Sequence, residues 1–493
     1  MPKKKVVVAG GGTSGWLAAA GIAKLLGNTV EVSLIESAQI GRIGVGEATI
    51  PTLRLFHRLL GIDEAELMAA MQATIKLGIE FQNWGQKGDN YFHSFGTTGK
   101  GCWACDFPHF WLAAKQKGLA EDFSQYSLEL MAARQGKAAA GDNSAVNYAY
   151  HLDAGLYAEY LKKFSIKHGV NYIEGTINNV VIAKDNGYIE SLELDGDRSV
   201  GGDLFIDCTG FSARLIEGAL NTSYISYSEY LPCDSAVAIQ TELTGAPRPY
   251  TQAIAHDFGW QWRIPLQHRT GNGLVYSSRY VSDDEALATL MKNLESPAIT
   301  EPRSFKYNTG RREKAWNKNC IAVGLAAGFL EPVESTSIHL AMSAVFRLLK
   351  LFPIGEIEQV NVDEYNRQFR DEMDLVKNFV ILHYAATERD DTAFWRYCKG
   401  MELPAELTHR INLFRNTAAC PILENELFTV DSWAQVMMGQ GIHPNKYHTI
   451  VDVMTDKNLA GFLKSIKADV DNKVAKLKSH QAFLDSYCKA DKI

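Results

Sequence analysis

The sequence predicts an α/β fold in which a Rossmann-like βαβ unit opens the chain and a mainly helical lobe closes it. Residues 5–10 are an apolar run that ends in a glycine-rich turn at residues 10–15, GGGTSG. Residues 16–26 follow with helical apolar spacing, and residues 29–35 have the pattern of a second strand ending at Glu36. Strand, glycine turn, helix, strand and acidic residue in this order are typical of a dinucleotide-binding unit.

The glycine turn has the features that hold a dinucleotide. Its motif glycines allow a tight turn, close approach of the backbone to a pyrophosphate, and close packing of the helix on the strand. The start of the following helix directs N–H groups and the positive end of its dipole toward the phosphates. The acidic residue is expected to accept hydrogen bonds from ribose hydroxyls. The predicted cofactor-binding residues of this unit are Gly10, Gly12, Thr13, Ser14, Gly15 and Glu36.

Two later segments repeat the pattern of a buried strand that runs into a turn. They are residues 203–210 (DLFIDCTG) and 320–328 (CIAVGLAAG). Both can return to the first sheet, and Gly324 and Leu325 in the second segment are predicted to contact the cofactor. No second nucleotide turn of comparable quality follows, so a dedicated NAD(P)H domain is not expected. This arrangement suits a large flavoprotein and predicts FAD.

The composition is that of a large globular protein. The chain has 493 residues, 46% of them hydrophobic, which allows two or three lobes with a sizeable core. A net charge of −7 argues against general nucleic-acid binding. No run of about 18 apolar residues occurs, so no membrane-spanning helix is expected. Residues 362–376 and 458–477 have helical spacing, and we expect an FAD-binding domain at 1–355 and a helical substrate lobe at 356–493.

The eight cysteines are scattered along the chain, as in a reduced cytoplasmic protein. Cys102 and Cys105 form a CxxC pair with His109 nearby. A structural zinc site needs four ligands, and no second pair follows. A redox pair would lie at a strand–helix junction. A purely structural role is therefore favoured for the pair, and no metal site is predicted.

Residues 258–265, FGWQWRIP, are the most distinctive segment of the chain. In an extended strand, residues two apart share a face, so the indoles of Trp260 and Trp262 are expected side by side. An aromatic core pair would explain an arbitrary Trp-x-Trp. Here GWxWxIP and the glycine turn together resemble the motif pair of flavin-dependent tryptophan and indole halogenases. Residues 44–51 (GVGEATIP) and 379–395 resemble further segments of that family, and the resemblance covers most of the chain.

The resemblance implies an FAD-binding domain of the flavin monooxygenase type and gives roles to individual residues. Ala48 would bind the cofactor, while Trp260 and Trp262 would form a wall that keeps organic substrate away from the flavin. Lys76 matches the family's catalytic lysine, which engages hypohalous acid by a hydrogen bond or as a haloamine. Without that context, the alternation in residues 74–84 predicts a strand and a solvent-exposed Lys76. A desolvated lysine with a lowered pKa would suit the haloamine role.

Residues 334–337 have a structural and a functional interpretation. Ser335 or Thr336 is a candidate N-cap for a helix with apolar residues at 338, 342, 345 and 349. The helix dipole would then stabilise the negative charge of Glu334. The resemblance implies instead that Glu334 works with the lysine and takes a proton from the ring, and that the backbone at Thr336 and Ser337 binds the halide. The tryptophan enzymes commonly have glycine at the position of Ser337, which leaves the preference between chloride and bromide open.

Three residues are implied to line the substrate pocket. His93 and Phe95 match positions that line the aromatic pocket in relatives, although His93 fits a core histidine equally well. Trp433 is a candidate wall. The tyrosine and glutamate set with which tryptophan halogenases hold the amino acid's backbone is not recognisable in the helical lobe. An indole-type ring is therefore a more secure substrate than free tryptophan.

The functional hypothesis is an FADH2- and O2-dependent halogenase that brominates or chlorinates an indole or other electron-rich aromatic through Lys76. A separate NAD(P)H-dependent flavin reductase would supply FADH2. The alternatives are an FAD-dependent aromatic monooxygenase, against which Lys76, Glu334 and GWxWxIP argue, and a non-catalytic flavoprotein, which nothing in the sequence favours. A homodimer is compatible with this hypothesis.

Overall fold

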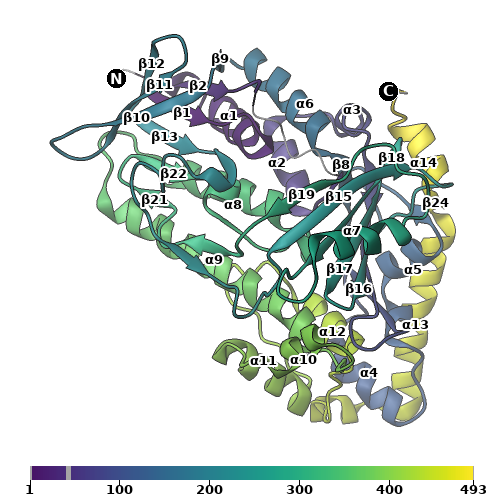
Figure 1. Ribbon diagram of the computed structural model, residues 1–493. Helices are drawn as coiled ribbons and strands as arrows, with labels where there is room; N and C mark the ends of the chain where they lie inside the picture. The colour runs from purple at the N-terminus through teal and green to yellow at the C-terminus, as the bar shows by residue number, and fades with distance from the viewer. Residues whose placement is uncertain (1–2, 40–45, 492–493) are drawn as a thin grey trace. The chain divides into compact units, whose positions relative to one another are not determined.

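The computed structural model describes residues 3–39 and 46–491, which are arranged in two compact units (Figure 1). Unit 1 comprises Met1–Ala73, Leu152–Ser228 and Tyr307–Asp374, and unit 2 comprises Thr74–His151, Glu229–Lys306 and Leu375–Ile493. Each unit is therefore assembled from three separate stretches of the chain. The division into functional regions at residue 355 stays a prediction.

Unit 1 is built on a six-stranded sheet with the βαβ unit near its centre. The strand order is β21 (Trp316–Asn317), β22 (Cys320–Ala322), β13 (Leu204–Asp207), β1 (Lys4–Ala9), β2 (Val30–Glu36) and β9 (Asn171–Glu174). All neighbours pair in parallel except β21 and β22. The valines of β1 are buried, as expected for a parallel strand covered on both faces. The two later segments predicted to join the first sheet, β13 and β22, both do so.

Helix α1 (Thr13–Leu26) follows the glycine turn and packs against α6 (Ala154–Lys167) and α8 (Ser337–Lys350) (Figure 1). Gly21 permits the close approach of α8, because a Cβ there would lie 3.0 Å from a methyl group of Val345. The other helices and strands of unit 1 are β3 (Gly46–Ala48), α2 (Thr52–Leu60), α3 (Glu64–Ala70), β10 (Ile177–Ile182), β11 (Ile189–Leu194), β12 (Arg198–Gly201), β14 (Tyr224–Ser226), β20 (Gly310–Arg312) and β23 (Gly328–Phe329).

Unit 2 contains a seven-stranded sheet that is mostly antiparallel. The order is β19 (Arg303–Lys306), β15 (Ser235–Glu242), β18 (Arg269–Tyr276), β17 (Gly259–Pro265), β16 (Thr251–His256), β5 (Gly78–Gln82) and β6 (Asn90–Ser94). The strand predicted over residues 74–84 is split, because β4 (Thr74–Lys76) pairs with β8 (Ala149–Asp153) whereas β5 pairs with β16 and β6. Leu77 separates the two strands, and its N–H donates to the carbonyl oxygen of Pro249 at 2.8 Å.

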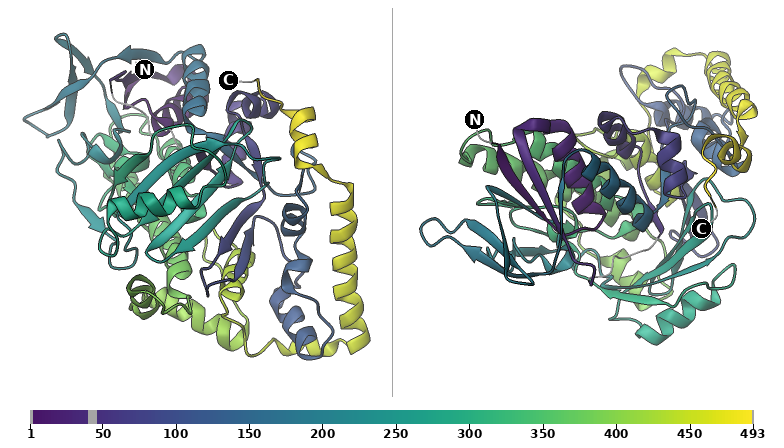
Figure 2. Two further views of the ribbon diagram at one scale, coloured as in Figure 1. Left: turned by 45° about the vertical axis from the view of Figure 1, so that its right-hand side comes forward. Right: turned by 90° about the horizontal axis from the view of Figure 1, so that it is seen from above.

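The C-terminal part of the chain is mainly helical, as predicted. The long α9 (Gln359–Ala385) begins in unit 1 and ends in unit 2. In unit 2, α13 (Asp456–Lys476) runs beside α4 (Phe107–Gln116) and α5 (Leu128–Arg134), which Figure 2 shows as yellow and blue helices. The other elements of unit 2 are β7 (Lys137–Ala138), α7 (Asp283–Lys292), α10 (Ala393–Gly400), α11 (Ala405–Thr417), α12 (Val430–Gly439), β24 (Lys478–Ser479) and α14 (His480–Tyr487).

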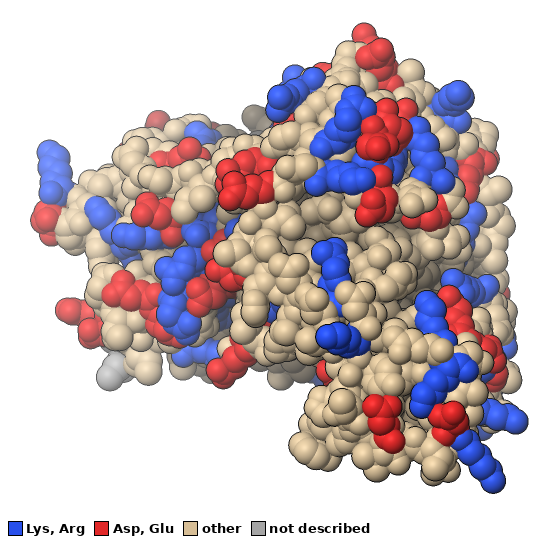
Figure 3. Space-filling view, turned by 90° about the horizontal axis from the view of Figure 1, so that it is seen from below, with Lys and Arg blue, Asp and Glu red and all other residues tan. Residues whose placement is uncertain are grey.

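Charged side chains of both signs are interspersed on the face shown in Figure 3, in keeping with the small net charge. This face carries broad uncharged areas between the charged groups. Among the helices formed by the described residues, none combines the length and the apolar character needed to cross a bilayer.

Candidate active site

The glycine turn of unit 1 can be made only with glycine at two of its positions. Gly10 has a φ of +113°, and a Cβ there would lie 2.3 Å from the carbonyl oxygen of Cys208 in the turn after β13. A Cβ on Gly15 would lie 1.9 Å from the carbonyl oxygen of Gly10. Both distances are far below van der Waals contact, so larger residues would force the turn, β13 and α1 apart.

Gly12 differs from its neighbours because a Cβ there would meet nothing within 4 Å. It is the N-cap of α1, it offers no side chain to cap the helix, and its carbonyl oxygen accepts the N–H of Trp16 at 3.1 Å. The first N–H groups of a helix lack intrahelical partners and attract anions. The turn is therefore open on the side where a pyrophosphate approaches, and the residues present fit a dinucleotide cofactor.

Glu36 lies against this turn at the end of β2. Its carboxylate forms an ion pair with Lys162 of α6 at 3.0 Å, and the Lys162 ammonium lies 3.8 Å from the ring centroid of Tyr172. A Cβ on Gly11 would lie 2.3 Å from the Glu36 carboxyl carbon, so the middle glycine allows the carboxylate to reach the turn. Lys162 was not predicted from the sequence, since only the fold brings α6 beside β2.

The third predicted cofactor segment meets the glycine turn. Gly324 has a φ of +68°, and a Cβ there would lie 2.2 Å from the hydroxyl oxygen of Ser14. Leu325 follows it and is half-buried. Ala48 is buried at the end of β3, and residues 44 and 45 of its motif lie outside the described residues. The structure thus brings Gly324 to the N-terminal turn, as expected for two parts of one nucleotide site.

Residues 334–336 directly precede helix α8, and Ser337 is its first residue. Glu334 is completely buried, and Ser335 has left-handed backbone with a φ of +59°. Thr336 occupies the N-cap position, but its side chain does not cap the helix. Its hydroxyl oxygen is buried and has no hydrogen-bond partner among the described residues. A buried hydroxyl without a partner at a helix N-terminus fits a site that receives a small polar or anionic group.

Lys76 is completely buried at the end of β4 in unit 2. The expectation of a solvent-exposed lysine is wrong, because strand alternation cannot tell solvent from a second packed layer. The Lys76 ammonium nitrogen lies 4.9 Å from the ring centroid of Phe95. This is the distance of a cation–π contact, and Phe95 follows directly after β6.

Two buried histidines hold the strand that carries Lys76. His151 lies between two threonines, with its Nδ1 2.9 Å from Thr74 Oγ1 and its Nε2 2.9 Å from Thr251 Oγ1. Thr74 Oγ1 donates to the carbonyl oxygen of Pro265 at 2.7 Å, so its oxygen accepts the hydrogen bond that the His151 Nδ1–H donates. Burial, the Lys76 charge and His480 keep the pKa of His151 well below its usual value, and the imidazole is neutral.

The second histidine, His480, binds the backbone of Ile75, the residue before Lys76. Its Nε2 accepts the N–H of Ile75 at 3.1 Å, and its Nδ1 donates to the carbonyl oxygen of Pro247 at 2.7 Å. Burial lowers the pKa of His480 to about 4, so this ring is also neutral. Sequence reasoning missed both histidines, because residues 151 and 480 lie far from Lys76 in the chain and have no local motif.

The predicted pocket residues belong to an aromatic cluster in unit 2. His93 in β6 is buried, with its ring centroid 5.5 Å from that of Phe379 and 6.1 Å from that of Phe428. Trp433 in α12 packs edge-on against Phe379 at 4.8 Å and donates its indole N–H to Glu426 at 2.9 Å. His93 and Trp433 are thus brought together by Phe379 and Phe428, while Phe95 lies beside Lys76.

Trp260 and Trp262 lie on one face of β17, as predicted, with ring centroids 6.2 Å apart. Trp84 continues the aromatic layer at 6.2 Å from Trp260. Gly273 in the neighbouring strand β18 makes room for the second indole, because a Cβ there would lie 2.0 Å from the Trp262 ring. The Trp262 ring therefore packs directly against the backbone of β18 at Gly273.

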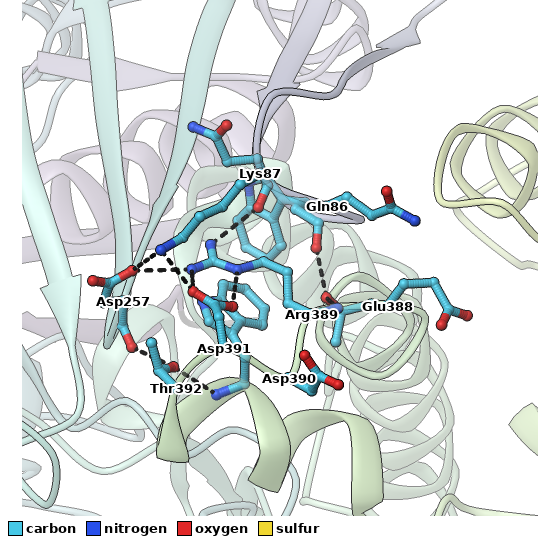
Figure 4. A network of polar contacts seen from close by, with 12 residues as sticks. Gln86, Lys87, Asp257, Glu388, Arg389, Asp390, Asp391 and Thr392 are labelled. Atoms are coloured by element: carbon cyan, nitrogen blue, oxygen red, sulfur yellow. Dashed lines mark hydrogen bonds and ion pairs between the residues drawn. The ribbon is translucent and has the colours of Figure 1, made fainter.

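A charged network braces the turn that precedes the tryptophan segment (Figure 4). The Arg389 side chain, only 2% exposed, pairs with Asp391 at 3.0 Å and with Asp257 at 3.1 Å. Lys87 bridges the same two carboxylates at 2.7 and 3.1 Å. Hydrogen bonds from Arg389, and then from Lys87, hold the pKa of Asp391 well below its usual value. Asp257 begins the two-residue turn between β16 and β17, so the network holds this turn in place.

No metal centre is formed by the described residues, among which no three His, Cys, Asp or Glu side chains are grouped as ligands. His109, which was considered with the CxxC pair, accepts the N–H of His448 at its Nδ1 at 3.0 Å. None of the eight cysteines, all of which lie within the described residues, forms a disulfide.

A dinucleotide turn at the head of a parallel sheet fits a flavoprotein, and a buried lysine beside an aromatic ring fits a site for an aromatic substrate. The tryptophan halogenase family model matches residues 5–456, and the chain belongs to the flavin-dependent tryptophan halogenase family. It is a flavin-dependent halogenase, an oxidoreductase, and the aromatic monooxygenase alternative is not favoured. The predicted α/β fold, with its FAD-binding domain and helical lobe, is confirmed.

Three relatives illustrate the similarity. The tryptophan 6-halogenase SttH of Streptomyces toxytricini is 36% identical over 445 residues, which cover 83% of this chain and 84% of that protein. The structure of Xcc4156, a flavin-dependent halogenase from Xanthomonas campestris, is similar with a TM-score of 0.98, 50% identity and full coverage of both chains. That of BrvH, a flavin-dependent halogenase from Brevundimonas sp. BAL3, gives a TM-score of 0.94 and 40% identity over 99% of each chain.

Proposed function

We propose that the protein uses reduced FAD and O2 to oxidise bromide or chloride, and that Lys76 directs the resulting hypohalous acid onto an indole-type ring. The observation that carries this proposal is the complete burial of Lys76 beside Phe95. A lysine is rarely withdrawn from water without a functional reason, because desolvating its charge is costly.

The glycine turn, Glu36 and the Gly324 turn would hold the cofactor. The turn supplies backbone N–H groups for the pyrophosphate, and Glu36 supplies carboxylate oxygens for ribose hydroxyls. Lys162 orients the Glu36 carboxylate through their ion pair. When bound, the reduced flavin supplies the two electrons that, with O2, convert halide to hypohalous acid and water.

Lys76 can act on hypohalous acid in two ways. As an ammonium it donates a hydrogen bond to the hypohalous oxygen, which makes the halogen more electrophilic. As a neutral amine, which burial favours, it attacks the halogen and forms a haloamine while water leaves. The neutral state of His151 adds no second positive charge near the amine. Both routes end with attack of an electron-rich carbon on the halogen.

The start of α8 would bind the halide. Its backbone N–H groups at Thr336 and Ser337 and the helix dipole attract an anion of this size. A contact through the backbone tolerates serine in place of glycine at residue 337, although the half-buried side chain reduces the space there. Glu334, completely buried one turn earlier, is proposed to accept the proton that the halogenated ring loses.

The substrate proposed is an indole-type ring. His93, Phe95 and Trp433 would form aromatic walls, since flat rings stack on or pack edge-on against such side chains. Trp260 and Trp262 would separate the organic substrate from the flavin. The relatives named above include a tryptophan 6-halogenase, and free tryptophan is therefore the second substrate to test.

A separate NAD(P)H-dependent flavin reductase is the proposed partner, because the sequence has only one nucleotide turn of good quality. The expected cytoplasmic location and a homodimer stay predictions.

The test is a product assay on the wild-type protein. Purified protein is incubated with FAD, a flavin reductase, NADH, O2 and indole or tryptophan, with bromide or chloride. We expect a product whose mass spectrum has the isotope pattern of one halogen and which requires halide. A hydroxylated product formed equally without halide would instead establish a monooxygenase, and bound FAD without any turnover would indicate a non-catalytic flavoprotein.

A further inference from the structure

The CxxC pair lies in a tight turn of unit 2 that is closed before α4 begins. The Cys102 N–H donates to the carbonyl oxygen of Cys105 at 2.8 Å. Gly101 allows this closure, because a Cβ there would lie 2.9 Å from the same carbonyl oxygen. The turn faces solvent, since the side chain of Trp103 between the two cysteines is 93% exposed. The backbone therefore holds the two cysteines together in a region that solutes reach.

The two sulfur atoms are close, but their surroundings differ. The Sγ atoms are 3.9 Å apart, within hydrogen-bond distance for sulfur. Cys102 is exposed, whereas Cys105 is buried. One thiol is thus open to a small solute, and the other is shielded from it.

Hydrogen bonding separates the two thiols further. The sulfur of Cys102 accepts the backbone N–H groups of Ala104 and Cys105, and these bonds lower the pKa of the Cys102 thiol. Burial, followed by the hydrogen bond to Cys102, raises the pKa of Cys105 to about 12. An exposed, stabilised thiolate beside a protonated partner is the arrangement of an attacking and a resolving cysteine.

We propose that Cys102 and Cys105 are a dithiol site that hydroperoxides oxidise to an intramolecular disulfide. In the first step the Cys102 thiolate attacks one oxygen of hydrogen peroxide, which forms a sulfenic acid and releases hydroxide. In the second step the Cys105 sulfur attacks the sulfenic sulfur, the S–S bond forms, and the thiol proton leaves with the hydroxyl group as water. The two thiols lose two electrons, and the peroxide gains them. A small dithiol reverses the reaction by thiol–disulfide exchange.

The other cysteines provide an internal comparison. Cys233, Cys320, Cys398, Cys420 and Cys488 are buried, and Cys208 is half-buried with a pKa that burial raises well above its usual value. None of these combines exposure with a lowered pKa. A zinc site is the competing interpretation, but the described residues supply no third ligand to this pair. The structure therefore favours the redox interpretation over the purely structural one that the sequence alone favoured.

The test treats the reduced full-length protein with a small excess of hydrogen peroxide under non-denaturing conditions. We expect the intact mass to fall by about 2 Da, for the two hydrogens lost, and peptide mapping to place the disulfide between Cys102 and Cys105. Treatment with a dithiol should restore the original mass. A first oxidation at any other cysteine, or gain of a single oxygen without loss of the two hydrogens in the wild-type protein, would overturn the proposal.

Two variants distinguish the roles of the thiols. In Cys105→Ser, a sulfenic acid should accumulate at Cys102 and be trapped by dimedone. In Cys102→Ser, Cys105 should react at least about tenfold more slowly than Cys102 does in the wild type, because it is buried and protonated. Equal reactivity of Cys105 in that variant, or stoichiometric zinc bound by the wild-type pair, would contradict the assignment. Circular dichroism should show that both variants are folded, and no part of the test depends on halogenase activity.

Discussion

The glycine turn of unit 1 and strand β4 of unit 2, which ends at Lys76, differ in whether backbone or side chain makes the proposed site. At the turn, the proposed cofactor site depends on the backbone, because Gly10 and Gly15 are required by their close approach to neighbouring carbonyl oxygens. At the strand, the proposed catalytic role depends on one side chain, that of Lys76, which is completely buried. His151 and His480 hold that strand from distant parts of the sequence.

This difference explains what each site tolerates. A backbone site is lost when a Cβ enters the wrong space, even where the protein still folds. A buried side-chain site is lost when the side chain or its supporting hydrogen bonds change, even where the cofactor still binds. The two sites should therefore be separable by mutation, and the following predictions test that separation.

A large effect on cofactor binding is expected at Gly12. In Gly12→Ala the new methyl group meets no protein atom within 4 Å, so the protein without FAD should lose no more than about 1 kcal/mol of stability, the usual cost of alanine at a helix N-cap. The methyl group would occupy the space of the pyrophosphate, and we expect the Kd for FAD to rise about 100-fold, or about 2.7 kcal/mol. Fluorescence titration of FAD measures this change. Gly461→Ala, also with open space around its Cβ, is the matched control, and equal FAD affinity of both variants would refute the assignment.

The second effect concerns the network of Figure 4 in unit 2. Arg389→Met leaves Asp391 and Asp257 without their buried partner, and we expect a loss of about 2 to 3 kcal/mol in the free energy of unfolding. The loss stays below that of a fully buried pair because Asp257 is 57% exposed. Urea unfolding measures it. Lys399→Met, which breaks an exposed ion pair with Glu388, should cost less than about 1 kcal/mol.

The pH dependence of this variant follows from Asp391. Its pKa is lowered in the folded protein, so the ion pair stabilises the fold above the ordinary aspartate pKa of about 4 and less as the pH falls below it. The difference in stability between wild type and Arg389→Met should therefore shrink below about pH 4. A difference that is constant from pH 7 to pH 3 would show that packing, and not charge, causes the loss.

The smallest effect is expected at Asp431, near the proposed pocket wall. Burial raises its pKa to about 6, so the ionised carboxylate destabilises the fold increasingly as the pH rises from about 4 to about 6. Asp431→Asn removes this charge and keeps an oxygen to accept the Thr98 N–H. We expect a gain of at most about 1 kcal/mol at pH 8 and none at pH 4, measured by thermal unfolding. Asp390→Asn, on the exposed surface, is the control, and a gain at both pH values would contradict the explanation.

The sequence predicted the backbone site in more detail than the side-chain site. The strand, the glycines, the helix and Glu36 follow one another in the chain, so a local pattern was enough to predict them. The apolar pattern of β13 and β22 likewise indicated buried strands of the same sheet, which the structure shows. The side-by-side indoles of Trp260 and Trp262 followed from strand periodicity alone.

Long-range packing explains what the sequence did not predict. Alternation alone placed Lys76 in solvent, because a local pattern does not reveal that another layer covers the polar face. The split between β4 and β5, the pairing of Lys162 with Glu36 and the histidines beside Lys76 all depend on partners distant in the chain. The Thr336 side chain was a candidate cap, yet its hydroxyl is buried without capping the helix.

The most direct test of the account compares two products in Lys76→Met. With saturating FAD, reductase, NADH, O2 and bromide, hypohalous acid released to a chemical trap and halogenated indole are quantified in one reaction. We predict that the variant binds FAD as the wild type does and still forms trapped hypohalous acid, while halogenated indole falls at least about 1,000-fold, or about 4 kcal/mol in the barrier. Halogenated indole at the wild-type rate would contradict the role of Lys76.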